Sequence, residues 1–212
     1  MNDFTLHGRP GWGSAIVEAQ LAWYGLPYRI EESGDLFDSE EARDKLRPLN
    51  PLTQVPTLVL PDGQVMTESA AITLHLADLT GRDDLVPGPK ASERAAFLRW
   101  LVYLVANIYP TFTYADEPSR FVKAEGAGEG FRAEVDTYAR RLWGIVEGAA
   151  GRPCFLGERF SALDIYLAVM TQWRPRPKWF AENAPMISAA AQRAAALAAL
   201  APVMERNFPK KG

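Results

Sequence analysis

The residue pattern of this chain changes near residue 80, and the change limits the folds that its 212 residues can adopt. Before that point short apolar runs alternate with stretches of helical periodicity, whereas after it only helical periodicity is evident. The stretch between the two, residues 80–92 (TGRDDLVPGPKAS), is polar and rich in glycine and proline, as linkers often are. We therefore predict a small α/β domain followed by an all-helical domain.

The first 80 residues predict the order β-α-β-α-β-β-α, a mixed sheet with helices. Gly25 is placed to end the first helix, and Pro61-Asp62-Gly63 predicts the turn of a hairpin. Ser69 is placed to cap the last helix. The expected strands cover residues 4–7, 27–32, 57–60 and 64–67, and the expected helices cover about 14–24, 39–48 and 69–80.

The remainder of the chain predicts a helical bundle. Apolar residues at helical spacing predict a helix from Phe97 to Ile108, which Pro110 is expected to stop. The same spacing predicts separate helices over residues 131–145 and about 188–200. Residues 161–173 (SALDIYLAVMTQW) are apolar on most faces, which predicts a central, buried helix. This helix opens with Ser161 and Asp164 at capping-box spacing, so we predict that both are structural caps. Losing such a cap costs about 0.5–2 kcal/mol.

The composition excludes several classes of function. The net charge is −3 and the isoelectric point is about 5.5, so no basic field is expected to bind nucleic acid. Two histidines and one cysteine are too few for a zinc site and leave no internal disulfide. No apolar run approaches the roughly 20 residues that span a bilayer, and the first ten residues contain no secretory-type apolar core. A cytoplasmic protein without metal or membrane association is therefore expected.

Three motifs together resemble cytosolic glutathione transferases over essentially the whole chain. They are residues 50–58 (NPLTQVPTL), 67–79 (TESAAITLHLADL) and 157–169 (GERFSALDIYLAV). The resemblance implies a thioredoxin-like, glutathione-binding βαβαββα domain at 1–80, a linker at 81–91 and an all-helical domain at 92–212. It also implies glutathione as co-substrate, a hydrophobic electrophile as second substrate, a detoxification reaction and a homodimer.

The resemblance further implies where glutathione binds. The bond preceding Pro56 is expected to be cis, which turns the backbone of Val55 outward to pair with the cysteinyl unit. Ser69, with the free N–H groups of the helix start, suits the γ-glutamyl carboxylate, and Glu68 suits the ammonium. Gln54 is expected to add a polar contact. A serine that starts a helix is more often a plain cap, but its place beside Val-Pro across a hairpin favours a ligand site.

The group that activates the thiol is expected in the loop of residues 7–14 (HGRPGWGS). Many bacterial relatives carry a serine or cysteine around the positions of Trp12 and Gly13. Trp12 has no hydroxyl, and the nearest hydroxyl in this chain is that of Ser14. Ser14 either donates to the thiolate or only caps the helix. Arg9 either helps by charge or is solvated, and Trp12 is expected to wall the pocket. Lowering a thiol pKa of about 8.5 by two units takes about 2.7 kcal/mol.

The second substrate is expected among aromatic side chains after the linker. Candidate pocket residues are Tyr103, Asn107, Tyr114 and Trp173, although aromatic residues at helical spacing are more often core. Two functions of different classes remain. The first is a glutathione S-transferase, or a related glutathione-dependent peroxidase or isomerase. The second is a glutathione-transferase-like binding or scaffold protein without turnover.

Overall fold

The computed structural model describes residues 3–209 and divides into two compact units. One unit comprises Met1–Val86 together with Arg193–Gly212, and the other comprises Pro87–Gln192. The chain therefore changes from one unit to the other just after the predicted end of the α/β domain, and its last residues return to the first unit. The family boundaries at residues 80 and 92 stay a prediction.

The first unit contains a four-stranded mixed sheet with the strand order β2-β1-β3-β4. β1 runs parallel to β2 and antiparallel to β3, which pairs antiparallel with β4. The strands are β1 (Phe4–Gly8), β2 (Tyr28–Glu32), β3 (Thr57–Val59) and β4 (Val65–Met66), and the intervening helices are α1 (Ser14–Tyr24), α2 (Glu40–Leu46) and α3 (Ser69–Thr80). The predicted order and the thioredoxin-like fold class are confirmed.

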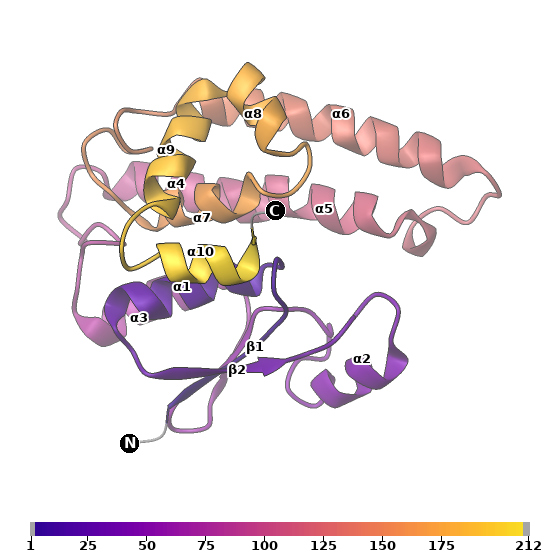
Figure 1. Cartoon of the computed structure of the whole chain (residues 1–212), viewed down its shortest axis with the longest axis horizontal. Helices are drawn as coiled ribbons and strands as arrows, with labels where there is room; N and C mark the ends of the chain where they lie inside the picture. The colour runs from indigo at the N-terminus through magenta and orange to yellow at the C-terminus, as the bar shows by residue number, and fades with distance from the viewer. Residues whose placement is uncertain (1–2, 210–212) are drawn as a thin grey trace. The chain divides into compact units, whose positions relative to one another are not determined.

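The core of this unit forms where β1 meets α1. Leu6 is fully buried at the centre of the sheet, opposite Ile30 on β2 and Leu58 on β3. α1 and α3 pack side by side, and Figure 1 shows both of them along the sheet. Gly25 ends α1 as predicted, and its φ of 66° is the left-handed conformation common at helix ends.

The end of the chain differs from the expected single alanine-rich helix over 188–200. α9 (Pro185–Ala195) stops early, and a separate helix α10 (Ala201–Asn207) follows with Pro202 in its first turn. Proline suits the first turn of a helix because the N–H that it lacks would be unpaired there. α10 belongs to the first unit and lies alongside α1 (Figure 1).

The second unit is helical, as predicted. It contains α4 (Arg94–Tyr103), a π-helical segment (Leu104–Ile108), α5 (Tyr109–Asp116), a 3₁₀ turn (Pro118–Arg120), α6 (Ala127–Glu147), α7 (Ala162–Met170), α8 (Pro177–Asn183) and most of α9. Every residue of α7 is buried, which confirms the expected central helix. α5 runs beside α6 (Figure 1).

The prediction that Pro110 stops the helix is wrong. The chain stays helical through Leu104–Ile108, where it widens to a π-helix, and Pro110 lies in the first turn of α5. A proline inside a helix lacks one donor and clashes with the carbonyl four residues earlier. A local change of the helical hydrogen-bond pattern accommodates both effects, so the helix continues.

Candidate functional site

Three loops of the first unit meet at one apolar cluster. Leu36, Ala42 and Leu46 form its buried centre, and the partly buried side chains of Trp12 and Val55 pack against them. Trp12 comes from the loop before α1, whereas Val55 precedes β3. The cluster therefore packs two loops against α2. One is the loop of residues 7–14 (the thiol loop), which is expected to activate the thiol, and the other is the segment around Val55, which is expected to pair with the peptide.

Polar contacts hold the segment before α2 in place. The guanidinium of Arg9 forms an ion pair with Asp35 at 2.5 Å and lies over the ring of Trp12, 5.1 Å from its centroid. Its hydrogen bond is the main reason why the pKa of Asp35 is held below its usual value. The Asp35 carboxylate also accepts from the N–H groups of Phe37 and Asp38, at 2.9 and 3.2 Å. Arg9 is therefore engaged with this segment rather than solvated.

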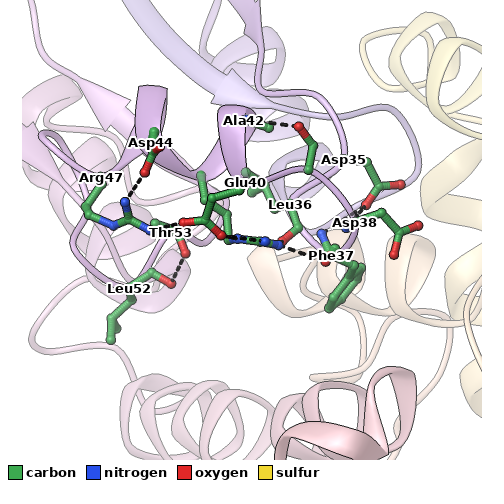
Figure 2. Close-up of polar contacts among 12 residues, drawn as sticks. Asp35, Leu36, Phe37, Asp38, Glu40, Ala42, Asp44, Arg47, Leu52 and Thr53 are labelled. Atoms are coloured by element: carbon green, nitrogen blue, oxygen red, sulfur yellow. Dashed lines mark hydrogen bonds and ion pairs between the residues drawn. The ribbon is translucent and has the colours of Figure 1, made fainter.

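α2 forms a charged rim beside this cluster. Figure 2 shows Arg47 between Glu40 and Asp44, and Ser39 caps the helix by accepting from Ala42 N–H at 3.1 Å. Arg43 donates to the carbonyl oxygens of residues 36 and 37, at 3.0 and 2.8 Å. The helix is thus tied to the segment on which Trp12 packs.

The loop before β3 is held by two residues that the sequence interpretation missed. The side-chain amide of Asn50, which is buried, donates to Gln54 O at 2.9 Å and to Thr57 Oγ1 at 3.1 Å. Thr57 Oγ1 also donates to Gln54 O at 2.9 Å. An Asn-Pro dipeptide is a turn signal, so Asn50-Pro51 could have indicated this role.

These contacts fix the backbone of Val55. The Val55–Pro56 bond is cis, as the resemblance implies, and Pro56 is buried. Within residues 3–209 neither the N–H nor the C=O of Val55 has a hydrogen-bond partner. The side chain of Gln54 is exposed. The loop therefore presents a free donor and a free acceptor to an extended peptide.

The start of α3 lies across the hairpin from that loop. β3 and β4 pair Leu58 with Met66 and Val59 with Val65, so the segment that precedes β3 and the segment that follows β4 leave the hairpin at the same end. Ser69 is not the N-cap as predicted; it is the first helical residue, and Glu68 takes the cap position with a φ of 64°. For a residue other than glycine such a backbone costs about 1–3 kcal/mol and is concentrated at functional sites.

The first turn of α3 offers unpaired donors. Glu68 makes no side-chain cap, and the N–H groups of residues 69–71 have no acceptor among the described residues. Together with the helix dipole they favour an anion. Buried hydrogen bonds from Gln20 to Thr73 (2.9 Å) and from Thr73 to Ser69 O (2.9 Å) hold this turn against α1.

The hydroxyl of Ser14 faces the backbone of its own loop. It accepts from Arg9 N–H at 3.1 Å and lies 3.2 Å from Arg9 O, to which it donates, and Ser14 is 4% exposed. Gly13 holds the N-cap position and α1 has no side-chain cap, so of the two alternatives for Ser14 the capping role is not the one that the structure has. A methyl group at Gly8 would lie 2.5 Å from Ser14 Oγ, so the close approach requires glycine there.

Comparison with known proteins identifies the family. A family model described as the N-terminal domain of glutathione S-transferase matches residues 14–79. The chain is 43% identical to the uncharacterized GST-like protein YncG of Escherichia coli K12 over 205 residues. The aligned region covers 95% of this chain and 97% of that protein. The chain belongs to the glutathione S-transferase family.

Other members of the glutathione S-transferase family agree with this assignment. Glutathione S-transferase GstA of Escherichia coli O157:H7 is 29% identical over 187 residues, covering 88% of this chain and 90% of its own. A glutathione transferase homologue from Sulfitobacter, solved with bound glutathione, superposes with a TM-score of 0.83 at 26% identity over 97% of this chain and 98% of its own. The family catalyses glutathione conjugation, and glutathione is its co-substrate.

The described residues offer neither a metal-binding cluster nor a membrane-spanning helix. Residues 3–209 contain no group of three or more histidine, cysteine, aspartate or glutamate side chains that could hold a metal ion. Over the same residues no helix is both long and apolar enough to cross a membrane.

The four residues predicted to line the electrophile pocket all lie in the helical unit, in three separate groups of contacts. Tyr103 packs edge-on against Trp100, and Asn107 donates to Tyr103 O at 3.3 Å. Trp173 packs against Tyr109 and Phe112, with centroids 5.5 and 5.0 Å apart. Tyr114 is exposed and packs against Phe121.

Tyr109 extends the aromatic group around Trp173. Its hydroxyl is buried without a hydrogen-bond partner in the described part of the chain. Burial raises the pKa of Tyr109, so its phenol stays protonated and keeps its proton for an acceptor. Binding pockets lined mainly by aromatic side chains usually contain a few polar groups that orient the ligand, and an unpaired hydroxyl donor is a group of this kind.

Ser161 and Asp164 have the geometry of a capping box at the start of α7. Ser161 Oγ accepts from Leu163 N–H at 3.3 Å, and Asp164 accepts from Ser161 N–H at 2.9 Å. Asp164 also accepts from Phe155 N–H at 2.8 Å, which joins the preceding turn to the helix. Burial raises the pKa of Asp164 to about 6, against the opposing effect of these bonds.

The raised pKa of Asp164 predicts a pH dependence of stability. Between the ordinary aspartate pKa of 3.8 and about 6 the native state binds a proton that the unfolded state does not, so this contribution to stability falls as pH rises through that window. Its full range is on the order of 2–3 kcal/mol. Asp164→Asn lacks this titration, so the unfolding free energy of the native protein relative to that variant should fall between pH 4 and pH 7 in denaturant titrations. A difference that rises with pH would contradict the assignment.

Proposed function

We propose that the protein is an active glutathione transferase, which binds glutathione in its first unit and conjugates it to a hydrophobic electrophile. The observation that carries the proposal is the pair of unfilled backbone sites on one hairpin. Val55 offers a free donor and acceptor just before β3, and Glu68 and the free N–H groups of α3 follow β4, the strand that pairs with β3. A zwitterionic peptide matches both sites.

Each part of glutathione then has a proposed partner. The cysteinyl backbone pairs with Val55 beside Pro56, as an added strand would. The γ-glutamyl carboxylate binds Ser69 and the first turn of α3, and its ammonium binds Glu68. Gln54 adds a polar contact. Arg9 and Trp12 border the site by linking the thiol loop to the segment before α2.

We propose that Ser14 stabilises the thiolate at the start of α1. Its bond to Arg9 O, at 3.2 Å, is long for a hydroxyl donor, so the proton can turn to a stronger acceptor. The N–H groups of Gly13 and Ser14 lie at the N-terminus of α1 and have no acceptor among the described residues. Together with the helix dipole they would favour a thiolate there.

Ser14→Ala should raise the pKa of the bound thiol by about one to two units. At pH 6.5 the conjugation rate should then fall roughly 5–50-fold, because about half of the native bound thiol is ionised at that pH and each pKa unit is about a tenfold change once the pKa lies well above it. Stopped-flow or steady-state conjugation of an aryl halide measures the rate, and ultraviolet absorbance of the thiolate measures the pKa. Ser188→Ala, a buried serine of α9, is the matched control. An unchanged rate in Ser14→Ala would remove this hydroxyl from the mechanism and leave the N–H groups of the helix start.

The electrophile is proposed to bind aromatic residues of the helical unit, with Tyr103, Asn107, Tyr114 and Trp173 as contacts. Alanine substitution at each should raise the KM for the electrophile while leaving glutathione affinity unchanged. An unchanged KM in all four variants would reject this pocket.

One observation favours binding without turnover as the second candidate. The Ser14 hydroxyl is buried and already engaged with Arg9, and Trp12 has no hydroxyl to replace it. A glutathione-binding protein that leaves the thiol pKa unshifted would fit this candidate. Peroxidase or isomerase activity with glutathione is tested in the same preparation with a hydroperoxide and a cis-enedione.

We also propose a cytoplasmic homodimer. Leu52, Leu79 and Val102 are 64%, 54% and 57% exposed, so these apolar side chains are available to a second copy of the chain. Sedimentation should give twice the 23.5 kDa of one chain at micromolar concentration. A monomer under these conditions would contradict the dimer, and recovery in the membrane fraction of cells would contradict the location.

A further inference from the structure

The last residue of α10 reaches the loop that precedes α1. Asn207 is 6% exposed, and its Oδ1 accepts a hydrogen bond from Gly11 N–H at 3.1 Å. Its Nδ2 donates to Glu18 Oε2 and to Val203 O, both at 2.9 Å. Because both Nδ2 partners are acceptors, the amide can have only the orientation that leaves Oδ1 for Gly11.

The loop and the end of α10 are in close contact at Gly11. Gly11 has a φ of 79°, and a methyl group there would lie 3.3 Å from Asn207 O. On its other side the loop is closed by the two hydrogen bonds between Ser14 and the Arg9 backbone. Asn207 and Ser14 therefore hold the same short loop at two points.

A separate contact fastens α10 to α1. Glu18 is 3% exposed on α1, and its carboxylate forms an ion pair with Arg206 besides accepting from Asn207. Val203 is also buried in α10. The Arg206 ion pair and the burial of Val203 do not involve the Asn207 side chain, so these two docking contacts can be tested separately from the bond to Gly11.

We propose that Asn207 is a positioning residue that fixes the loop of residues 9–13 through the N–H of Gly11. The C-terminal helix is then part of the scaffold of the thiol site, although it is some 200 residues away in sequence. The effect on the thiol rests on the proposed function, whereas the fixing of the loop does not. A rigid loop keeps the groups at the start of α1 aligned with a bound thiolate.

The test compares Asn207→Ala with Val203→Ala in the full chain. Val203→Ala loosens α10 but keeps the carbonyl that Asn207 uses, so it controls for helix docking. Amide hydrogen exchange of the loop in ligand-free protein should become roughly tenfold faster in Asn207→Ala, relative to β1, and stay unchanged in Val203→Ala. With glutathione bound, the thiol pKa should rise by about one unit only in Asn207→Ala, so that about tenfold less thiolate forms well below the pKa.

A double variant tests rescue and remains informative if Asn207→Ala does not fold. Glu18→Gln with Asn207→Asp exchanges the amide and the carboxylate. This keeps an acceptor for Gly11 N–H and a hydrogen bond to position 18, but it loses the bond to Val203 O and the ion pair of Glu18 with Arg206, so the variant is compared with Glu18→Gln alone. It should restore slow exchange in the loop. Equal exchange in native and Asn207→Ala proteins, or fast exchange in the double variant, would overturn the proposal. If the native protein fails to bind glutathione, the proposed function fails while exchange still decides the role of Asn207.

Discussion

Asp164→Ala is expected to lower the free energy of unfolding by about 3 kcal/mol. The loss of a helix cap accounts for about 1 kcal/mol. The larger part comes from Phe155 N–H, which is bonded to Asp164 at 2.8 Å and would be left buried without an acceptor, at a cost of about 1–3 kcal/mol. The total exceeds the 0.5–2 kcal/mol expected for a cap alone, because one carboxylate serves both the helix start and the preceding turn.

Denaturant titration followed by tryptophan fluorescence measures this effect. Asp164→Asn retains one oxygen acceptor and should lose less stability than Asp164→Ala. Asp44→Ala removes an exposed carboxylate paired with Arg47 on α2 and should stay within about 0.5 kcal/mol of the native protein. A loss below about 1 kcal/mol in Asp164→Ala, or lost activity at unchanged stability, would contradict a structural role.

Glu68→Gln is expected to weaken glutathione binding by about 10–100-fold. The substitution keeps the size of the side chain at the start of α3 but removes the charge proposed to bind the ammonium. Hydrogen bonds to charged groups contribute about 1.5–3 kcal/mol, which corresponds to that range of affinity. Ser69→Ala should have a smaller effect, about 3–10-fold, because the backbone N–H groups of the first turn remain.

Isothermal titration calorimetry with glutathione measures both changes. Glu134→Gln, an exposed position on α6, makes the same chemical change elsewhere and should leave the affinity unaltered. A control ligand that lacks the α-ammonium should bind the native protein and Glu68→Gln equally. Equal affinity of both proteins for glutathione itself would show that Glu68 does not bind the ammonium.

Local signals explain what the sequence predicts well. The element order of the α/β unit follows from short apolar runs, from Gly25 and from the Pro61-Asp62-Gly63 turn, all of which act over a few residues. The buried α7 follows from its apolar composition alone. The cis bond before Pro56 follows from resemblance to a family, since proline makes such a bond accessible without determining it.

Long-range contacts explain what the sequence leaves out. The roles of Asn50 and Asn207 depend on hydrogen-bond partners that the fold brings together, and a polar side chain does not reveal its partner in sequence. The continued helix at Pro110 depends on a π-helical widening that propensity does not signal. Ser69 has the composition of a cap, but a positive φ at Glu68 moves the helix start by one residue.

An ultraviolet titration of glutathione bound to the native protein tests the central claim most directly. Thiolate absorbance followed against pH should show the bound thiol ionising well below 8.5, by about two units if the start of α1 stabilises it as proposed. Binding with an unshifted thiol pKa, or no binding at millimolar glutathione, would contradict the account.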